Sequence, residues 1–168
     1  GLLWRARGGG NASGCGLLKI GATAEPMAAP LQALKNGVRP VALSHVIESA
    51  RAFLVAVIAG EIPATLWVIC PSVRTQELLH ESLVNWLPDV LFLPEAEFLA
   101  VENILPDQEI AAERLALLSR VEMSKRRHVI VATRASLEQP APQWGALRSA
   151  ALRLRRGMAQ AREPVMAS

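Results

Sequence analysis

The chain has 168 residues, a formal net charge of +3 and 51% hydrophobic residues. This is enough for one domain with a buried core and part of a second. The small positive excess permits phosphate-rich partners without requiring them. With only two cysteines a disulfide framework is excluded, which favours a reducing, cytoplasmic compartment. No apolar run reaches the ~18 residues of a membrane span, so no membrane partner is expected.

Residues 1–40 are rich in glycine and proline, with a glycine-rich run at Gly8–Gly16. This composition predicts a flexible N-terminal segment, with at most one or two helical turns at Leu31–Leu34. From Val41 to Ala59 the apolar residues recur at helical spacing, and Ser44 is a suitable N-cap. A helix is therefore expected to precede the first strand.

The stretch from Thr65 to Pro94 predicts a strand, a helix and a second strand. Leu66–Cys70 is a short apolar run typical of a strand buried on both faces, and Ser72 is a suitable N-cap for the helix that follows. In that helix the leucines are expected to face the core, with Gln76 on the polar side. Val90–Leu93 is the second apolar run, and the two strands are expected to pair in parallel through a right-handed crossover.

Further along, Pro106 and Asp107 predict the start of another helix, whose apolar face is drawn through Ala111, Leu115, Leu118 and Val121. His128–Ala132 predicts a third strand. A proline-bounded linker is expected at Ser136–Pro142, and a half-exposed strand at Leu152–Met158. Three apolar strands separated by helices indicate an α/β fold with a small parallel sheet, which would carry a nucleotide site at its carboxyl edge.

The chemistry that such a site needs is absent from the sequence. No GxxxxGK[ST] motif occurs, and Gly8–Gly16 neither follows a strand nor opens a helix. Cys70 could act as a nucleophile with His80 or His128 as its base, but a buried structural cysteine is the favoured interpretation. His45 joins these two in a scattered set without the spacing of metal ligands, so no metal site is expected.

Three groups of charged or aromatic residues could have a catalytic or binding role, but an ordinary surface or core role is favoured for each. Glu95, Glu97 and Glu102 could form a carboxylate pair, although a solvated acidic loop is favoured. The arginines of residues 148–162 lack an aromatic partner for base stacking, which favours an ordinary basic surface over a nucleic-acid site. The tryptophans Trp67 and Trp86 are expected in the core.

From Ala50 to Pro140 the order of segments resembles the N-terminal UvrB-homology module of bacterial transcription-repair coupling factors. The residues Trp86–Pro94, WLPDVLFLP, look like that family's helix stop and second strand. Residues 106–118, PDQEIAAERLALL, are similar to its acidic helix start. Val129–Leu137 resembles its third strand, followed by a Pro-x-Pro exit at residues 140–142.

This resemblance implies a three-layer RecA-like subdomain, related to the P-loop NTPases, over residues 41–140. It further implies the truncated start of an α+β UvrA-interaction domain at 141–168, with most of the UvrA-binding surface missing from this chain. The degenerate phosphate-loop positions would be Glu48, Ser49, Ala50, Arg51 and Ala52. Arg51 stands where the family's lysine is expected, Ala52 where the Mg²⁺-binding hydroxyl is expected, and Glu48 adds negative charge.

The expected function is therefore a non-catalytic module that acts in nucleotide-excision repair by recruiting or masking UvrA. No cofactor is expected in this chain, and no catalytic residue. ATP and Mg²⁺ would serve the motor of the parent protein, which would also contact RNA polymerase and DNA. The alternatives are an ATP-dependent UvrB-type helicase module with a diverged phosphate loop and an unrelated α/β interaction domain.

Overall fold

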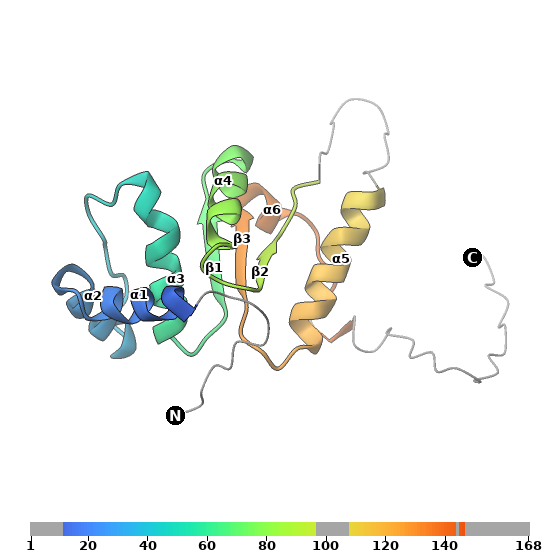
Figure 1. Cartoon of the computed structure of the whole chain (residues 1–168). Helices are drawn as coiled ribbons and strands as arrows, with labels where there is room; N and C mark the ends of the chain where they lie inside the picture. Colours follow the sequence, from blue (N-terminus) through green and yellow to red (C-terminus); the bar gives the residue numbers. More distant parts are fainter. Residues whose placement is uncertain (1–11, 97–107, 144, 147–168) are drawn as a thin grey trace, which may run out of the picture.

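The computed structural model describes residues 12–96, 108–143 and 145–146 (Figure 1). Three parallel strands form its centre, and helices cover both faces of the sheet. In chain order the elements are α1 Ala12–Thr23, α2 Glu25–Lys35, the 3₁₀ turn η1 Glu48–Ala50, α3 Arg51–Glu61, β1 Leu66–Cys70, α4 Val73–Leu83, β2 Val90–Phe92, α5 Gln108–Met123, β3 Val129–Thr133 and α6 Arg134–Glu138.

The sheet order is β1-β3-β2, with both outer strands parallel to β3. The α/β class and the parallel sheet are thus as expected, and β1 and β2 occupy the predicted positions. The expectation that these two strands pair directly is wrong. The last strand in the sequence, β3 (VIVAT), lies between them and is buried at all five positions.

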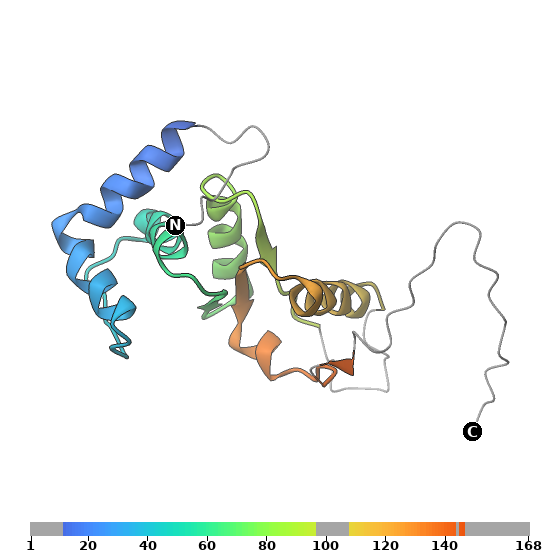
Figure 2. The ribbon, with the colours of Figure 1, turned by 90° about the horizontal axis from the view of Figure 1, so that it is seen from below.

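Two helical layers enclose the sheet (Figure 2). On one face Leu83 of α4 and Ala52 of α3 pack with Val129 and Val131 of β3. On the other face α5 covers β3 and β2, where Leu117 packs with Ile130. Helices α1 and α2 lie outside α3, farther from the sheet. They form a third apolar cluster with it through Met27, Leu31 and Val57.

The expected flexible segment is wrong for the residues that the structure describes there, because 12–35 form α1 and α2. Glycine has a packing role in this region. A Cβ on Gly21 would lie 2.5 Å from the Phe53 ring, so glycine lets α1 approach α3 closely. Pro26 stands at the start of α2, where a backbone N–H has no helical partner.

The helix expected from Val41 begins later than predicted. Residues 39–47 are irregular, and η1 and α3 start at Glu48 and Arg51. Ser44 therefore caps no helix. His45 has a φ of 58°, in the left-handed region that a right-handed helix cannot use. Ser72, by contrast, is confirmed as the N-cap of α4, since its hydroxyl accepts the Thr75 N–H.

The structure also differs from the expectations for one tryptophan and for the proline-bounded linker. Trp67 and Ile69 of β1 are 42% and 60% exposed, because α5 covers only β2 and β3 on that face. Trp86 packs on the core and meets the Phe53 ring edge-on at 5.1 Å between centroids. Part of the expected linker forms the short helix α6. The expected strand Leu152–Met158 lies outside the described residues.

Candidate functional site

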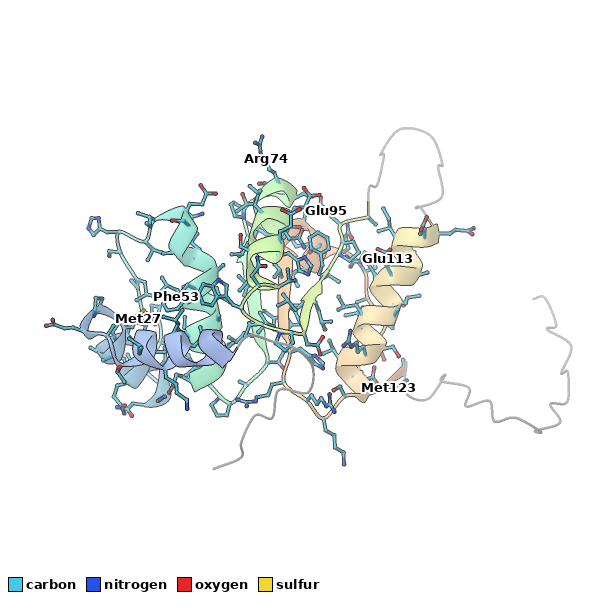
Figure 3. The ribbon with its side chains drawn as sticks, viewed as in Figure 1. Met27, Phe53, Arg74, Glu95, Glu113 and Met123 are labelled. Carbon is cyan, nitrogen blue, oxygen red and sulfur yellow. The ribbon has the colours of Figure 1, made fainter. Side chains whose placement is uncertain are left out.

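The carboxyl edge of the sheet is where a ligand of a parallel α/β sheet would bind. Strand β1 leads there into Pro71 and Ser72, β2 into Leu93–Ala96, and β3 into α6. In Figure 3 Arg74 and Glu95 mark this end of the molecule, while Met123 marks the opposite end. The start of α3 also lies here, because Arg51 lines a groove together with Cys70 and Pro71.

Between β2 and β3, polar side chains seal this edge. The Gln76 amide Nε2 donates to the carbonyl oxygens of Leu93, at 2.8 Å, and Val131, at 2.9 Å. Gln76 is fully buried, so one side chain ties the end of β2 to β3 beneath α4. Its Oε1 has no hydrogen-bond partner among the described residues.

Arg114 of α5 closes the same edge from the other face of the sheet. Its guanidinium donates to the carbonyl of Pro94, at 2.6 Å, and to that of Ser136, at 3.0 Å. Burial lowers the pKa of this guanidinium from its ordinary value. The arginine therefore uses its charge to hold two chain segments together, and the distance from each donor to its carbonyl leaves no room for a ligand between them.

Two further contacts complete the network. The Gln139 amide forms a two-way bridge with the backbone of Ala96, with distances of 2.7 and 3.0 Å. The Thr133 hydroxyl donates to the Glu95 carboxylate at 2.9 Å and also accepts the Ser136 N–H. Glu95 thus belongs to this network, and the expectation of a merely solvated loop is wrong for it. Glu97 and Glu102 lie outside the described residues.

The polar residues of this network were missed from the sequence, although a signal was present. Gln76 precedes Leu79 and Leu83 at helical spacing, which places it on the buried face of α4 and contradicts the expected polar side. Arg114 stands in the same relation to Leu117 and Leu118 on α5. A polar side chain on an apolar stripe at a sheet's carboxyl edge indicates an internal hydrogen bond to strand carbonyls.

On the β1 side the edge forms an open groove of about 340 Å³. Its lining is mainly apolar and comes from α3, β1, the start of α4 and the segment before η1. The lining residues are Leu43, Val46, Arg51, Leu54, Val55, Ile58, Val68, Ile69, Cys70, Pro71, Thr75 and Leu79. One cation and one hydroxyl-bearing side chain are too few to surround a polyphosphate.

Residues 48–52, where the resemblance predicts a degenerate phosphate loop, form η1 and the first turn of α3. Arg51 lines the groove, and its charge partly opposes the burial that raises the pKa of the Cys70 thiol. Ala52 is only 3% exposed and belongs to the core cluster. Glu48 and Ser49 belong to the tight turn of η1. The arrangement provides a helix start and one cation, and no cradle of backbone amides is formed by glycine.

Cys70 is 3% exposed, and burial raises its thiol pKa more strongly than Arg51 lowers it. Its register partner is Thr133 at the carboxyl end of the sheet, whereas His128 precedes β3 at the amino end. His80 lies near that end too, with its Nε2 3.3 Å from the Val90 carbonyl. The structure therefore brings neither histidine to Cys70, and the buried structural role fits its position.

His128 is buried, and its Nδ1 lies 3.9 Å from the carboxylate of Asp89, which also binds Arg120 at 2.8 Å. Among the described residues no cluster of three or more acidic, histidine or cysteine side chains could hold a metal ion. In the same part of the chain no helix combines the length and apolarity needed to cross a membrane. The arginines of 148–162 lie outside the described residues.

Comparison with known proteins identified no relative of this chain. No family model, curated protein or solved structure matches the chain. The fold and the side-chain geometry therefore stand on their own as the basis for a functional proposal.

Proposed function

We propose that this chain is a non-catalytic, RecA-like module of the kind found at the N-terminus of transcription-repair coupling factors. Residues 41–140 would form the UvrB-homology subdomain and residues 141–168 would begin the UvrA-interaction domain. In this role the sheet is a scaffold for contacts between proteins. Recruitment or masking of UvrA during nucleotide-excision repair would be its contribution to the cell.

The observation that supports this proposal is how side chains fill the carboxyl edge of the sheet. Gln76 and Arg114 fill its β2–β3 side with internal hydrogen bonds. On the β1 side the groove is apolar, and Ala52 is buried in the core where a Mg²⁺-binding hydroxyl would be needed. An edge organised in this way favours a scaffold over an ATPase, because the described residues at this edge include too few charge-stabilising groups for a triphosphate.

The resemblance at Trp86–Pro94 gains a physical meaning from the fold. Trp86 closes the α3–α4 interface against Phe53, and Pro88 follows α4 where the chain turns into β2. Asp89 then binds Arg120 of α5, so the junction connects both helical layers to β2. Because its residues make several structural contacts, the motif supports common ancestry of the scaffold. It does not support a catalytic role.

ATP and Mg²⁺ would be used only by the motor of the parent protein, which would also engage RNA polymerase and DNA. The runner-up is a UvrB-type helicase module whose phosphate loop has diverged but still binds ATP. Arg51 beside the start of α3 is the one feature that favours it. An unrelated α/β interaction domain is the third candidate.

A binding titration of UvrA against the immobilised full chain tests the partner. We expect saturable binding that falls at least tenfold when Arg153, Arg155 and Arg156 are replaced by glutamate, since these cations belong to the segment that resembles the UvrA-contacting module. The triple replacement of Lys19, Lys125 and Arg126 by glutamate is the charge-matched control, because these three side chains are exposed. Absence of binding by the unmodified chain would contradict the UvrA role.

The coding sequence downstream of Ser168 provides an independent test of ancestry. A continuation that encodes a polymerase-binding segment and an intact helicase motor would support the coupling-factor proposal. A stop codon shortly after Ser168 would contradict it as a description of a working protein.

A further inference from the structure

The outer edge of β1 is open in a way that follows from the strand register. The Leu66 N–H donates to the His128 carbonyl, so in a parallel ladder Leu66, Val68 and Cys70 direct their backbone groups to β3. The N–H and C=O groups of Trp67 and Ile69 consequently point away from the sheet. No described residue pairs with them. Their side chains are also the exposed ones of this strand.

This edge lacks the features that usually protect an outer strand. Leu66–Cys70 contains no charge, no proline and no bulge. The other edge is different, because β2 has only three residues and is flanked by Asp89 and Pro94. Unprotected apolar edges readily accept another strand. Strand β1 is therefore the site at which this sheet can grow.

An apolar groove lies beside this edge. The apolar groove runs between β1 and the α3 side chains Leu54 and Ile58, and Leu43 and Val46 line it with them. Leu43 and Val46 belong to the segment 39–46, which connects α2 to η1. Across that segment no backbone N–H or C=O group forms a hydrogen bond with any described residue. Unpaired backbone groups thus lie on both the edge and the segment next to it.

We propose that Val41–Ser44 closes onto β1 as a fourth, parallel strand. The direction is parallel because α3 runs between the segment and β1, as in a strand–helix–strand crossover. Val41 and Leu43 would then face α3 and the apolar groove. Ala42 and Ser44 would lie beside Trp67 and Ile69 on the other face. The inference rests on the groove and the register, and is independent of the UvrA proposal.

Side chains alternate between the two faces of a strand, so the register determines which backbone groups form hydrogen bonds. With Ala42 beside Trp67, the Leu43 N–H points to β1 and donates to the Trp67 carbonyl, while the Val41 carbonyl accepts the Trp67 N–H. The Leu43 carbonyl accepts the Ile69 N–H in the same way. The Ala42 N–H points away from β1. A proline at 43 therefore blocks closure, whereas a proline at 42 removes no bond from the new ladder.

Amide hydrogen exchange measured by NMR on the full chain tests this closure. The Trp67 and Ile69 amides should be protected in the unmodified chain and in Ala42→Pro, and should exchange at least roughly tenfold faster in Leu43→Pro. The Ile130 and Val131 amides of β3 are the internal control, and should stay protected in all three proteins. Equal, fast exchange of Trp67 and Ile69 in every protein would overturn the proposal.

A cysteine pair gives a second test that does not depend on the stability of the proline variant. Ala42→Cys with Trp67→Cys places two thiols on neighbouring strands, at a Cα separation that a disulfide can span. Oxidation should join them within one chain, as seen by peptide mass mapping. Ala42→Cys with Leu78→Cys, an exposed site on α4, should not join. If the first pair fails to join, or if protection appears only together with a doubled mass, closure by this segment is wrong.

Discussion

Strands β1 and β3 have the same length, pair in register over five residues and are almost equally apolar, yet their environments differ. Every residue of β3 is buried, whereas β1 alternates between partly covered and exposed positions up to Cys70, which is its one buried residue. The difference arises from position, because β3 has a strand on each side and a helix over each face. Strand β1 has one neighbour, and α5 does not reach its outer face. An apolar composition therefore indicates that a segment forms a strand. It does not indicate the position of that strand in the sheet.

The sharpest way to test this comparison is one substitution made in both strands. Ile130→Ala in β3 should lower the free energy of unfolding by about 2–5 kcal/mol, because a fully buried side chain is replaced by a cavity. Ile69→Ala in β1 should change it by about 0.5 kcal/mol or less, since its side chain is largely in water. Urea denaturation monitored by circular dichroism gives both values.

Equal losses in the two variants would contradict the difference between the strands. Strong protection of the Ile69 amide together with a small loss in Ile69→Ala would fit the closure of Val41–Ser44, because the added strand pairs with the backbone edge of β1 and leaves the outer face of Ile69 uncovered.

The second prediction concerns the polar link between β3 and β2. Gln76→Ala should lower the free energy of unfolding by about 2–3 kcal/mol, because the buried carbonyls of Leu93 and Val131 lose their donor. Gln32→Ala is the matched control. Gln32 bonds only to Asn36 on an exposed face of α2, so its loss should cost less than about 0.5 kcal/mol. A similar small effect in both variants would mean that Gln76 does not hold β2 in place.

Much of the scaffold could be predicted from the sequence, because short apolar runs and helix caps are local signals. Leu66–Cys70 and the Ser72 cap agree with the structure, and the third strand differs by one residue at each end. The order β1-β3-β2 could not be predicted, since it depends on which strand both helical layers can cover. The glycine-rich composition of residues 1–40 predicted flexibility, yet Gly21 lets α1 pack closely against Phe53 of α3.

For the candidate site, the sequence shows that the GxxxxGK[ST] motif does not occur. It does not show the network that seals the edge, because polarity alone predicts Gln76 on the solvent side of its helix and indicates no partner for Arg114. Their hydrogen-bond partners include the Val131 carbonyl within β3 and the Pro94 carbonyl just after β2, both far away in the sequence. A local sequence pattern cannot identify such distant hydrogen-bond partners.

The third prediction is the smallest and concerns the end of β1. Burial raises the pKa of the Cys70 thiol, and Arg51 opposes this. Alkylation of Cys70 at pH 8, followed by peptide mass spectrometry, should be slower in the folded chain than in urea. Arg51→Gln should slow it further, by roughly two- to fivefold, because less thiolate is present. Faster alkylation in Arg51→Gln would contradict the assigned sign.

The same shift fixes the pH dependence of stability. A thiol whose pKa is raised by folding contributes its full stabilisation below the ordinary value of 9.0. That contribution is lost as the pH rises from 9.0 through the raised pKa, because the unfolded chain ionises first. Cys70→Ala, which has no such group, should show a smaller loss of stability between pH 8 and pH 10.

The central claim is that this parallel sheet is a scaffold without a nucleotide site. Isothermal titration of the full chain with Mg²⁺-ATP tests it most directly, with Arg51→Ala measured under the same conditions. The account predicts no saturable heat for either protein at millimolar nucleotide, because the β2–β3 edge is filled by Gln76 and Arg114 and the β1 groove is apolar. Saturable micromolar binding that disappears in Arg51→Ala would contradict it and favour the helicase alternative.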